Sequence, residues 1–392
     1  MNHIKKVTRT ALLATALGAI SIAQASAEDL RIGVLTTLST PAGYIGEDVR
    51  DAIQLAIGDD GTLGNTPVTL VVEDDGLKPA NAKQAADRML DSGVKIFTGI
   101  IFSNVLAAVQ PSVMRADAFY ISSNAGPSNF AGDKCSPNYF VASYQNDAFH
   151  EAAGLSANKL GYKKMVILAP NYQAGRDALN GFKRTYEGEV VEEIYTNLNQ
   201  TDFSVELARI RSAAPDAIYQ FHPGGAGVNF AKQYDSSGLK ETVPMLVAAF
   251  SLDAQMVNAT GDAADGVYAS ALWTPEFDND ASRDFVKRFE EAYGRTPTMY
   301  AEQAYDTANL IASALDATGG SVDDPAAFRA ALQKADFQPI RDAFTFAPNQ
   351  HPIQNYYLTR YEKNADGKIV QNVVERIAEN YQDAYAKDCK ME

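Results

Sequence analysis

The chain contains little cysteine and histidine, which narrows the chemistry it can perform. Only two of its 392 residues are cysteine and four are histidine. The histidines are scattered and neither cysteine stands in a CxxC spacing, so the sequence indicates no metal cluster. It also lacks a GxSxG nucleophile elbow and a GxxxxGK[ST] phosphate loop. We therefore expect no enzyme, no cofactor and no metal. A secreted hydrolase stays open as an alternative that would need a nucleophile with a base within reach.

Positive charge is scarce as well. The sequence has 34 Lys and Arg against 49 Asp and Glu, a formal net charge of −15. Such a diffuse negative field argues against nucleic acid and anionic lipid surfaces as partners. It does not exclude a small anionic ligand, because backbone N–H groups at the start of a helix bind anions locally.

Long apolar runs are missing beyond the N-terminus. Lys5, Lys6 and Arg9 precede an apolar stretch over 11–23, and Ala25 and Ala27 form a small-x-small cleavage pattern. These features predict a cleaved signal peptide over residues 1–27. The apolar stretch is too short to cross a bilayer, and no cysteine follows it for lipid attachment. We expect an exported periplasmic protein that is not inserted in the membrane and is a monomer.

Export determines whether the two cysteines are expected to be oxidised. The oxidising compartment makes a disulfide between Cys135 and Cys389 our expectation, and it would tie the C-terminal tail to a much earlier loop. Two unpaired thiols remain the alternative.

Short apolar segments alternate with segments of helical periodicity along most of the chain. Leu30 to Leu35 predicts a strand, and Val49, Ile53 and Ile57 share one face of the helix that follows. Such alternation predicts right-handed crossovers and parallel sheets covered by helices on both faces. Further strands are predicted at 68–72, 95–100, 118–121, 164–168, 190–195, 217–221 and 245–248, and helices from about 79, 103, 147, 174, 203, 228, 281, 297 and 325.

The length of the chain exceeds what one hydrophobic core usually holds, so two lobes are expected. We place 28–144 and 275–348 in the first lobe, and 145–274 and 349–392 in the second. The segment 344–373 is predicted to form strands joined by a turn at 364–367.

Parallel sheets bind ligands beyond the carboxyl ends of their strands. The residues at those positions are rich in hydroxyls, amides and aromatic rings, and poor in acids. A cleft lined in this way holds a flat apolar body between rings and meets a carboxylate with hydroxyls and N–H groups. Each position taken singly is also compatible with an ordinary loop or helix cap. The candidates from strand ends are Tyr44, Phe102, Ser103, Asn124, Ala125, Gly126, Tyr172, Phe221, His222 and Phe250.

Several segments together resemble a known family. They are 32–46 (IGVLTTLSTPAGYIG), 73–75 (EDD), 99–103 (GIIFS), 121–126 (ISSNAG), 261–266 (GDAADG) and 305–308 (YDTA). In order and spacing the chain resembles the branched-chain amino acid-binding family of ABC-transporter solute-binding proteins. This resemblance implies the α/β fold of type I periplasmic binding proteins, with two doubly wound parallel-sheet lobes joined by a three-segment hinge. The ligand would lie between the lobes, and the partner would be an ABC permease.

The resemblance also implies roles for single residues. A hydroxyl at Ser103 and backbone groups at Asn124 and Gly126 would hold a ligand carboxylate, while rings at Tyr172 and Tyr300 would flank the ligand. Amino acid binders often have threonine at the position of Gly126, so one hydroxyl is missing here.

The largest departure from amino acid binders concerns the ligand's amino group. Those proteins carry an acidic residue at about Ala249 and Phe250, and this chain has none there. Burying an ammonium group without an anionic partner costs several kcal/mol. The segments 171–175 (NYQAG) and 221–225 (FHPGG) look like the branch that binds aromatic carboxylates. We therefore expect a benzoate-like acid, with an aliphatic amino acid or amide, other solutes, or a sensor role at a membrane receptor as alternatives.

Overall fold

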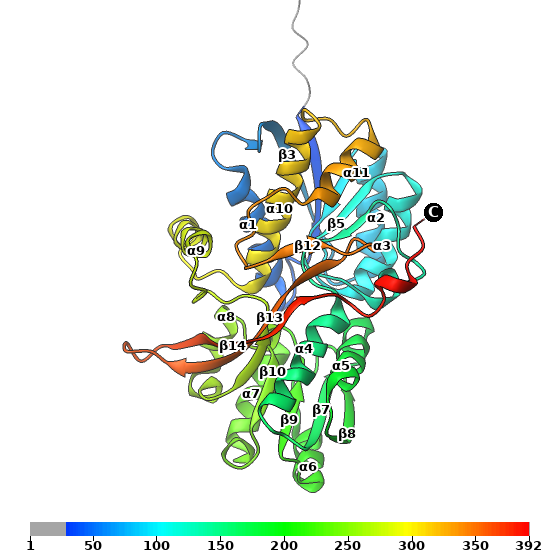
Figure 1. Cartoon of the computed structure of the whole chain (residues 1–392). Helices are drawn as coiled ribbons and strands as arrows, with labels where there is room; N and C mark the ends of the chain where they lie inside the picture. Colours follow the sequence, from blue (N-terminus) through cyan, green and yellow to red (C-terminus); the bar gives the residue numbers. More distant parts are fainter. Residues whose placement is uncertain (1–28, 392) are drawn as a thin grey trace, which may run out of the picture.

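The computed structural model describes residues 29–391, which form two lobes, each built around its own sheet (Figure 1). The predicted signal peptide, residues 1–27, lies outside the described residues. No helix within 29–391 is long and apolar enough to span a bilayer.

The first lobe contains a six-stranded sheet in the order β2-β3-β1-β4-β5-β6. All neighbours are parallel except β2 and β3, which form a hairpin. Val34 and Leu35 of the central β1 are fully buried, because helices cover both faces of a parallel sheet. The strands are β1 (Leu30–Thr36), β2 (Thr62–Leu63), β3 (Thr66–Asp74), β4 (Ile96–Thr98), β5 (Phe119–Ser122) and β6 (Tyr139–Val141).

Six helices belong to this lobe. The long α10 packs along α1, α2 packs against α3, and α11 packs on α10. Pro79 occupies the first turn of α2, where its missing N–H has no helical partner to lose. The helices are α1 (Gly43–Ile57), α2 (Pro79–Asp91), α3 (Ser103–Arg115), α9 (Asp280–Tyr293), α10 (Met299–Ala317) and α11 (Pro325–Lys334).

The second lobe contains an eight-stranded sheet in the order β12-β13-β11-β10-β9-β7-β8, with β14 paired to β13. The run from β11 to β8 is parallel, whereas β13 is antiparallel to β11, β12 and β14. Its strands are β7 (Lys164–Pro170), β8 (Glu189–Thr196), β9 (Ala217–Gln220), β10 (Met245–Ala248), β11 (Tyr268–Ala271), β12 (Phe344–Phe346), β13 (Pro352–Lys363) and β14 (Ile369–Tyr381). Its helices are α4 (Asn146–Lys159), α5 (Gln173–Thr185), α6 (Ser204–Ala213), α7 (Gly225–Ser236) and α8 (Ala254–Thr260).

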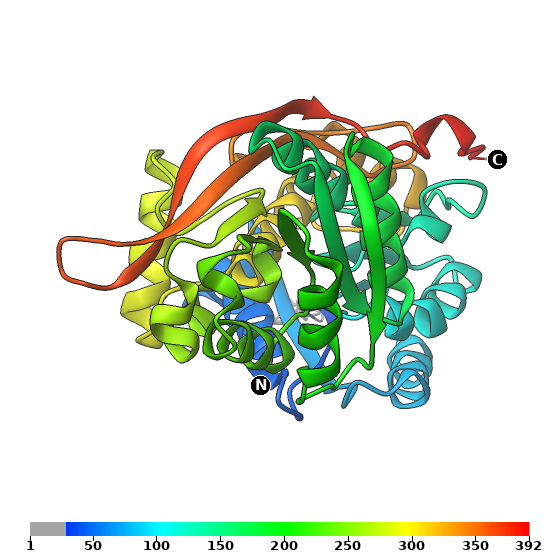
Figure 2. The same cartoon turned by 90° about the horizontal axis from the view of Figure 1, so that it is seen from below.

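Three segments carry the chain between the lobes: the link from β6 to α4, the link from β11 to α9, and the link from α11 to β12 and β13. The first and third are held together at Ser143, whose carbonyl oxygen accepts hydrogen bonds from Arg341 (3.2 Å) and Gln354 (3.0 Å). The β13–β14 ribbon runs along the second lobe and projects beyond it as a hairpin (Figures 1 and 2). This architecture confirms the predicted two-lobed type I fold.

Beyond β14 the chain returns to the first lobe. Cys389 forms a disulfide with Cys135, as predicted, and closes a sequence separation of 254 residues. Tyr385 on the same tail donates a hydrogen bond to Asp147 Oδ1 (2.8 Å). The tail is thus fixed to both lobes.

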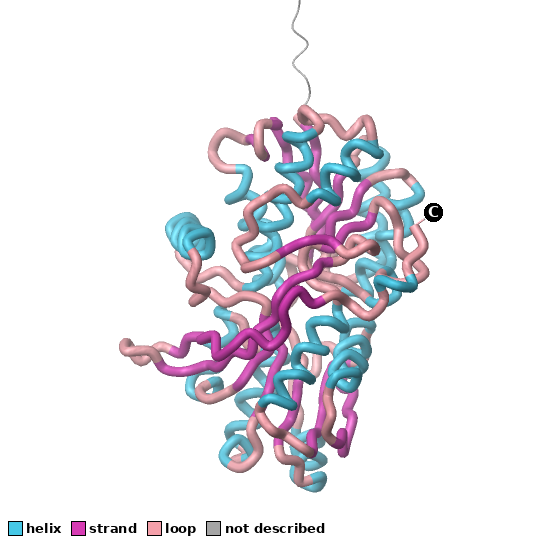
Figure 3. The backbone as a smooth tube through the Cα atoms, viewed as in Figure 1, coloured by secondary structure: helices cyan, strands magenta, loops and turns pink. Residues whose placement is uncertain are grey.

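The alternation of helices and strands in Figure 3 follows the prediction closely, apart from short elements. Strands β6 and β11, with three and four residues, and the seven-residue α8 were not predicted. Strands as short as β4 and β10 were predicted from their place between periodic helices, whereas these three elements lie outside that regular alternation.

Candidate ligand-binding site

The carboxyl ends of both parallel sheets face the boundary between the lobes, where most of the predicted site residues meet. Phe102, at the start of α3, contacts Tyr172, which precedes α5, with ring centroids 6.4 Å apart. Tyr44 of α1 donates a hydrogen bond to Asp253, which precedes α8, over 2.7 Å. Both contacts cross from the first lobe to the second, so the lobes are closed on each other.

A cluster of aromatic rings forms one wall. Phe250 lies 5.1 Å from Tyr300, 4.8 Å from Tyr144 and 4.7 Å from Phe149, measured between ring centroids. Phe250 comes from the second lobe, Tyr300 from the first and Tyr144 from the hinge. Sequence reasoning missed Tyr144, because it lies in an irregular stretch whose place beside Phe250 only the hinge decides.

The polar part of the site gathers at the ends of β4 and β5. Asn146, the first residue of α4, donates to Ser103 Oγ (3.2 Å) and accepts from the Gly126 N–H (3.2 Å). Ser123 Oγ and Asn124 Oδ1 are buried and have no hydrogen-bond partner among the described residues. Buried polar groups without partners are costly, and these two atoms lie at the end of β5, beside predicted site residues.

Gly126 has a packing reason to be glycine. A Cβ atom there would collide with the carbonyl oxygen of Tyr144. The hydroxyl that amino acid binders often carry at this position is therefore excluded by the close approach of the hinge, and not merely absent. Ala125 makes its hydrogen bonds through its backbone. Its carbonyl oxygen accepts from Ser122 Oγ (2.6 Å) and from the Tyr139 hydroxyl (3.2 Å).

Asn146 also connects the polar part to the second lobe. Its amide donates to Asp177 Oδ2 (2.9 Å), and Asp177 accepts in addition from the Ser128 N–H (3.1 Å) and hydroxyl (2.7 Å). Ser128 belongs to the first lobe and Asp177 to α5 of the second, and the side chain of Asp177 is buried. A continuous network of hydrogen bonds therefore runs from Ser103 to a contact that crosses between the lobes.

Asp253 is an acidic residue of the cleft that sequence reasoning missed. It is 3% exposed, and burial raises its pKa to about 7. It follows Phe250 by three residues, beyond the two positions at which an acid was expected in amino acid binders. The short 3-10 turn over Ala249–Ser251 brings it back to the cleft. Positions 249 and 250 lack an acidic residue, as the sequence shows, but Asp253 supplies an acidic side chain to the cleft.

His222 lies away from this set. Its two ring nitrogens contact Thr196 Oγ1 (3.0 Å) and Gln220 Oε1 (2.9 Å), its ring packs on Phe230, and burial lowers its pKa to about 3. All of these partners belong to the second lobe. Phe221 is buried beside His150, with ring centroids 4.8 Å apart. The structure therefore places both residues in the packing of the second lobe.

A cavity of about 330 Å³ opens between the lobes, and Phe102 is the predicted site residue that lines it. It is lined from the first lobe by Thr40, Pro41, Ala42, Leu77 and Phe102, and from the second by residues of the 198–201 and 223–229 segments. Among residues 29–391 no group of three His, Cys, Asp or Glu side chains could hold a metal ion.

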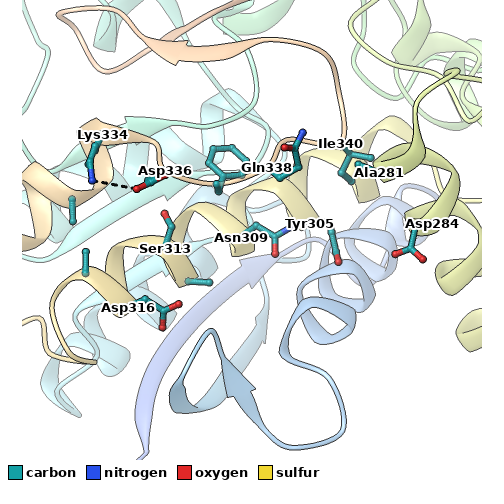
Figure 4. Close-up of a pocket in the computed structure, with 14 residues that line it drawn as sticks. Ala281, Asp284, Tyr305, Asn309, Ser313, Asp316, Lys334, Asp336, Gln338 and Ile340 are labelled. Carbon is teal, nitrogen blue, oxygen red and sulfur yellow. Dashed lines mark hydrogen bonds and ion pairs between the residues drawn. The ribbon is translucent and has the colours of Figure 1, made fainter.

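A second hollow, of about 680 Å³, lies outside the cleft, between α10, α11 and the start of α9 (Figure 4). Tyr305, Asn309, Ser313 and Asp316 line it from α10, and Lys334 and Asp336 form an ion pair at its rim. None of the predicted site residues lines this groove.

Comparison with known proteins identifies the family. A family model described as periplasmic binding protein matches residues 29–368. The chain belongs to the periplasmic binding protein family. A Leu/Ile/Val-binding protein homologue of Brucella melitensis is 28% identical over 374 residues, covering 93% of this chain and 95% of that protein.

Solved structures of periplasmic binding proteins resemble the whole described chain. An ABC-transporter solute-binding protein of R. palustris in complex with benzoate has a TM-score of 0.86 and 29% identity, covering 93% of this chain and 100% of that one. Another from R. palustris, in complex with 4-hydroxybenzoate, has a TM-score of 0.85 and 26% identity over 90% of this chain and 98% of that one. This periplasmic binding protein is therefore an extracytoplasmic solute-binding protein of the ABC-transporter type, and not an enzyme.

Proposed function

We propose that the protein captures an aromatic carboxylate between its lobes and delivers it to an ABC permease. The observation that carries this proposal is the aromatic wall of Tyr144, Phe250 and Tyr300, together with the unpartnered hydroxyl of Ser123. A flat ring packs against such side chains, and a carboxylate accepts from hydroxyl and N–H donors. The benzoate and 4-hydroxybenzoate complexes of the two R. palustris proteins support the same class.

Ligand capture is coupled to closure of the hinge in this proposal. The ligand carboxylate would contact Ser103, Ser123 and Asn124 of the first lobe, while Tyr172 and Phe250 of the second lobe cover the ring. Contacts made by both lobes favour the closed form, which the permease then recognises. We further propose that the protein works as a monomer in the periplasm after removal of residues 1–27.

Titration calorimetry tests the ligand class. Benzoate and 4-hydroxybenzoate should bind, and leucine and valine should not. Ser103→Ala and Tyr172→Ala should each weaken binding of the aromatic acids by about tenfold or more, since each removes a direct contact. The matched controls are Ser212→Ala and Tyr195→Ala, which change exposed residues of the second lobe. Binding of leucine or valine, and of neither aromatic acid, would refute the proposal.

An aliphatic amino acid is the second candidate. Asp253 favours it, because a carboxylate in the cleft could pair with an ammonium group, and the relatives named Leu/Ile/Val-binding homologues agree with it. The same titration separates the two candidates.

A further inference from the structure

Arg341 joins two of the three links between the lobes. It lies in the third link, from α11 to β12, and its side chain is 2% exposed. Its guanidinium donates hydrogen bonds to the carbonyl oxygens of Ser143 (3.2 Å) and Ala142, both in the first link, from β6 to α4. A guanidinium presents its donors in a rigid planar fork, so one side chain fixes two neighbouring carbonyl groups.

The same guanidinium faces two carboxyl groups of α10. Its Nε lies 3.7 Å from Glu302 Oε1 and 3.6 Å from Asp306 Oδ2, and both acidic side chains are buried. These three atoms have no hydrogen-bond partner among the described residues, so charge attraction holds Arg341 to the helix. The N–H of the adjacent Ile340 donates to Asp306 Oδ1 (2.9 Å). Burial raises the pKa of both carboxyl groups, so the pair retains one proton and the guanidinium balances the remaining charge.

The first link carries the polar part of the ligand site. Ser143 Oγ donates to the carbonyl oxygen of Asn124 (2.8 Å). Asn146, three residues further along, donates its N–H to the carbonyl oxygen of Gly126 (2.8 Å) and accepts the Gly126 N–H at its side chain (3.2 Å). The turn over 124–126 is therefore fixed to the same link that the guanidinium holds.

Two rings of the aromatic wall also follow from the segments that this guanidinium joins. Tyr144 comes directly after Ser143, and Tyr300 precedes Glu302 by two residues in the first turn of α10. Both rings pack on Phe250, at centroid distances of 4.8 and 5.1 Å respectively. Because the two rings belong to separate segments, their relative position depends on what holds the link against the helix.

We infer that Arg341 is a positioning residue for ligand binding: through the first link and α10 it sets both the polar part and the aromatic wall of the site. This inference rests on capture of a ligand between the lobes and not on the chemical class of that ligand. Arg341→Lys isolates the role of the fork. Lysine keeps a cation beside the two carboxyl groups, so the variant should fold, but its single ammonium group does not hold both carbonyl groups.

Hydrogen exchange of the exported chain without ligand is the first test. In Arg341→Lys the amides of Gly126 and Asn146, which are hydrogen-bonded to each other's residue, should exchange at least about fivefold faster than in the wild type. The amides of β7, in the centre of the second lobe, should change less. Unchanged exchange at both positions, or an equal rise at β7 from a general loss of stability, would overturn the inference.

Titration calorimetry with 4-hydroxybenzoate is the second test. Arg341→Lys should weaken binding about tenfold, and so should Ser143→Ala to a smaller extent, since it removes the hydrogen bond to Asn124. The loss in the double variant should be smaller than the product of the two single losses, because both changes act on the same turn. A loss equal to that product would overturn the inference.

Arg329→Lys is the matched control. Arg329 of α11 also donates to a backbone carbonyl, that of Pro137 (2.9 Å), but this contact lies on the far side of β6 from the first link. Its variant should bind within about twofold of the wild type. An affinity of Arg341→Lys within the same limit, even with a lower free energy of urea unfolding, would reduce Arg341 to a structural role and overturn the inference.

Failure of the proposed ligand class would be seen separately. If the wild type binds leucine and no aromatic acid, the proposed function fails and the same titrations are made with leucine. The exchange measurement needs no ligand, so it decides the inference about Arg341 in either case.

Discussion

Asp177 should control how firmly the lobes close on a ligand. Its buried carboxylate accepts four hydrogen bonds, of which the two from Ser128 cross from the first lobe to the second. A hydrogen bond to a charged group contributes about 1.5–3 kcal/mol, but in the open form hydrogen bonds to water replace part of this contribution. Loss of both bonds should therefore cost the closed form about 2 kcal/mol. Because 1.4 kcal/mol is tenfold in an equilibrium constant, Asp177→Ala should weaken ligand binding about 30-fold.

Calorimetry with 4-hydroxybenzoate, together with small-angle scattering, checks this expectation. The wild type should become more compact on ligand addition, and Asp177→Ala should do so only at higher ligand concentration. Ser128→Ala removes one of the crossing bonds and leaves Asn146 with its partner, so it should produce a smaller loss of the same kind. Asp278→Ala serves as the control, since that side chain is 96% exposed. An affinity of Asp177→Ala within twofold of the wild type would refute the reasoning.

Two further predictions concern stability. Replacing both cysteines (Cys135→Ser with Cys389→Ser) opens a loop of 254 residues and should lower the free energy of urea unfolding by up to about 5 kcal/mol. A loss below about 1 kcal/mol would mean that contacts such as Tyr385 with Asp147 already secure the tail. Burial lowers the pKa of His222 to about 3, so its contribution to stability is present above its unfolded pKa of about 6.5 and is lost as pH falls toward 3. His222→Gln should therefore have a lower free energy of urea unfolding than the wild type at pH 7, and this difference should shrink at pH 4.5. A difference that does not change with pH would contradict a lowered pKa of His222.

Much of the fold is readable from the sequence, because its longer elements are locally consistent. The apolar run Leu30–Leu35 and the stripe Val49, Ile53 and Ile57 mark a strand and a helix before any tertiary contact is known. Their repetition predicts parallel sheets, and the paired cysteines follow from export. The short β6, β11 and α8 were not predicted, since they lie outside the regular alternation of strand and helix that identified equally short strands such as β4 and β10.

The candidate site could be predicted only in part. Strand ends predicted Phe102, Ser103, Asn124 and Tyr172, which lie at the boundary between the lobes because parallel topology fixes the edge to which such residues belong. The same rule also selected His222, whose side chain turns into the second lobe and bonds to Thr196 and Gln220. Position along a strand does not determine the direction of a side chain after the strand has ended.

The sequence by itself determined the class of protein: an exported two-lobed chain with an aromatic, hydroxyl-rich set of strand ends. Only the tertiary structure decided what closes the cleft. Tyr44 and Asp253 are 209 residues apart, and Ser128 and Asp177 lie on different lobes, so no local pattern links them. They meet because the hinge brings the two separate sheets together. Asp253, which follows Phe250 by three residues, thereby meets Tyr44 of the other lobe.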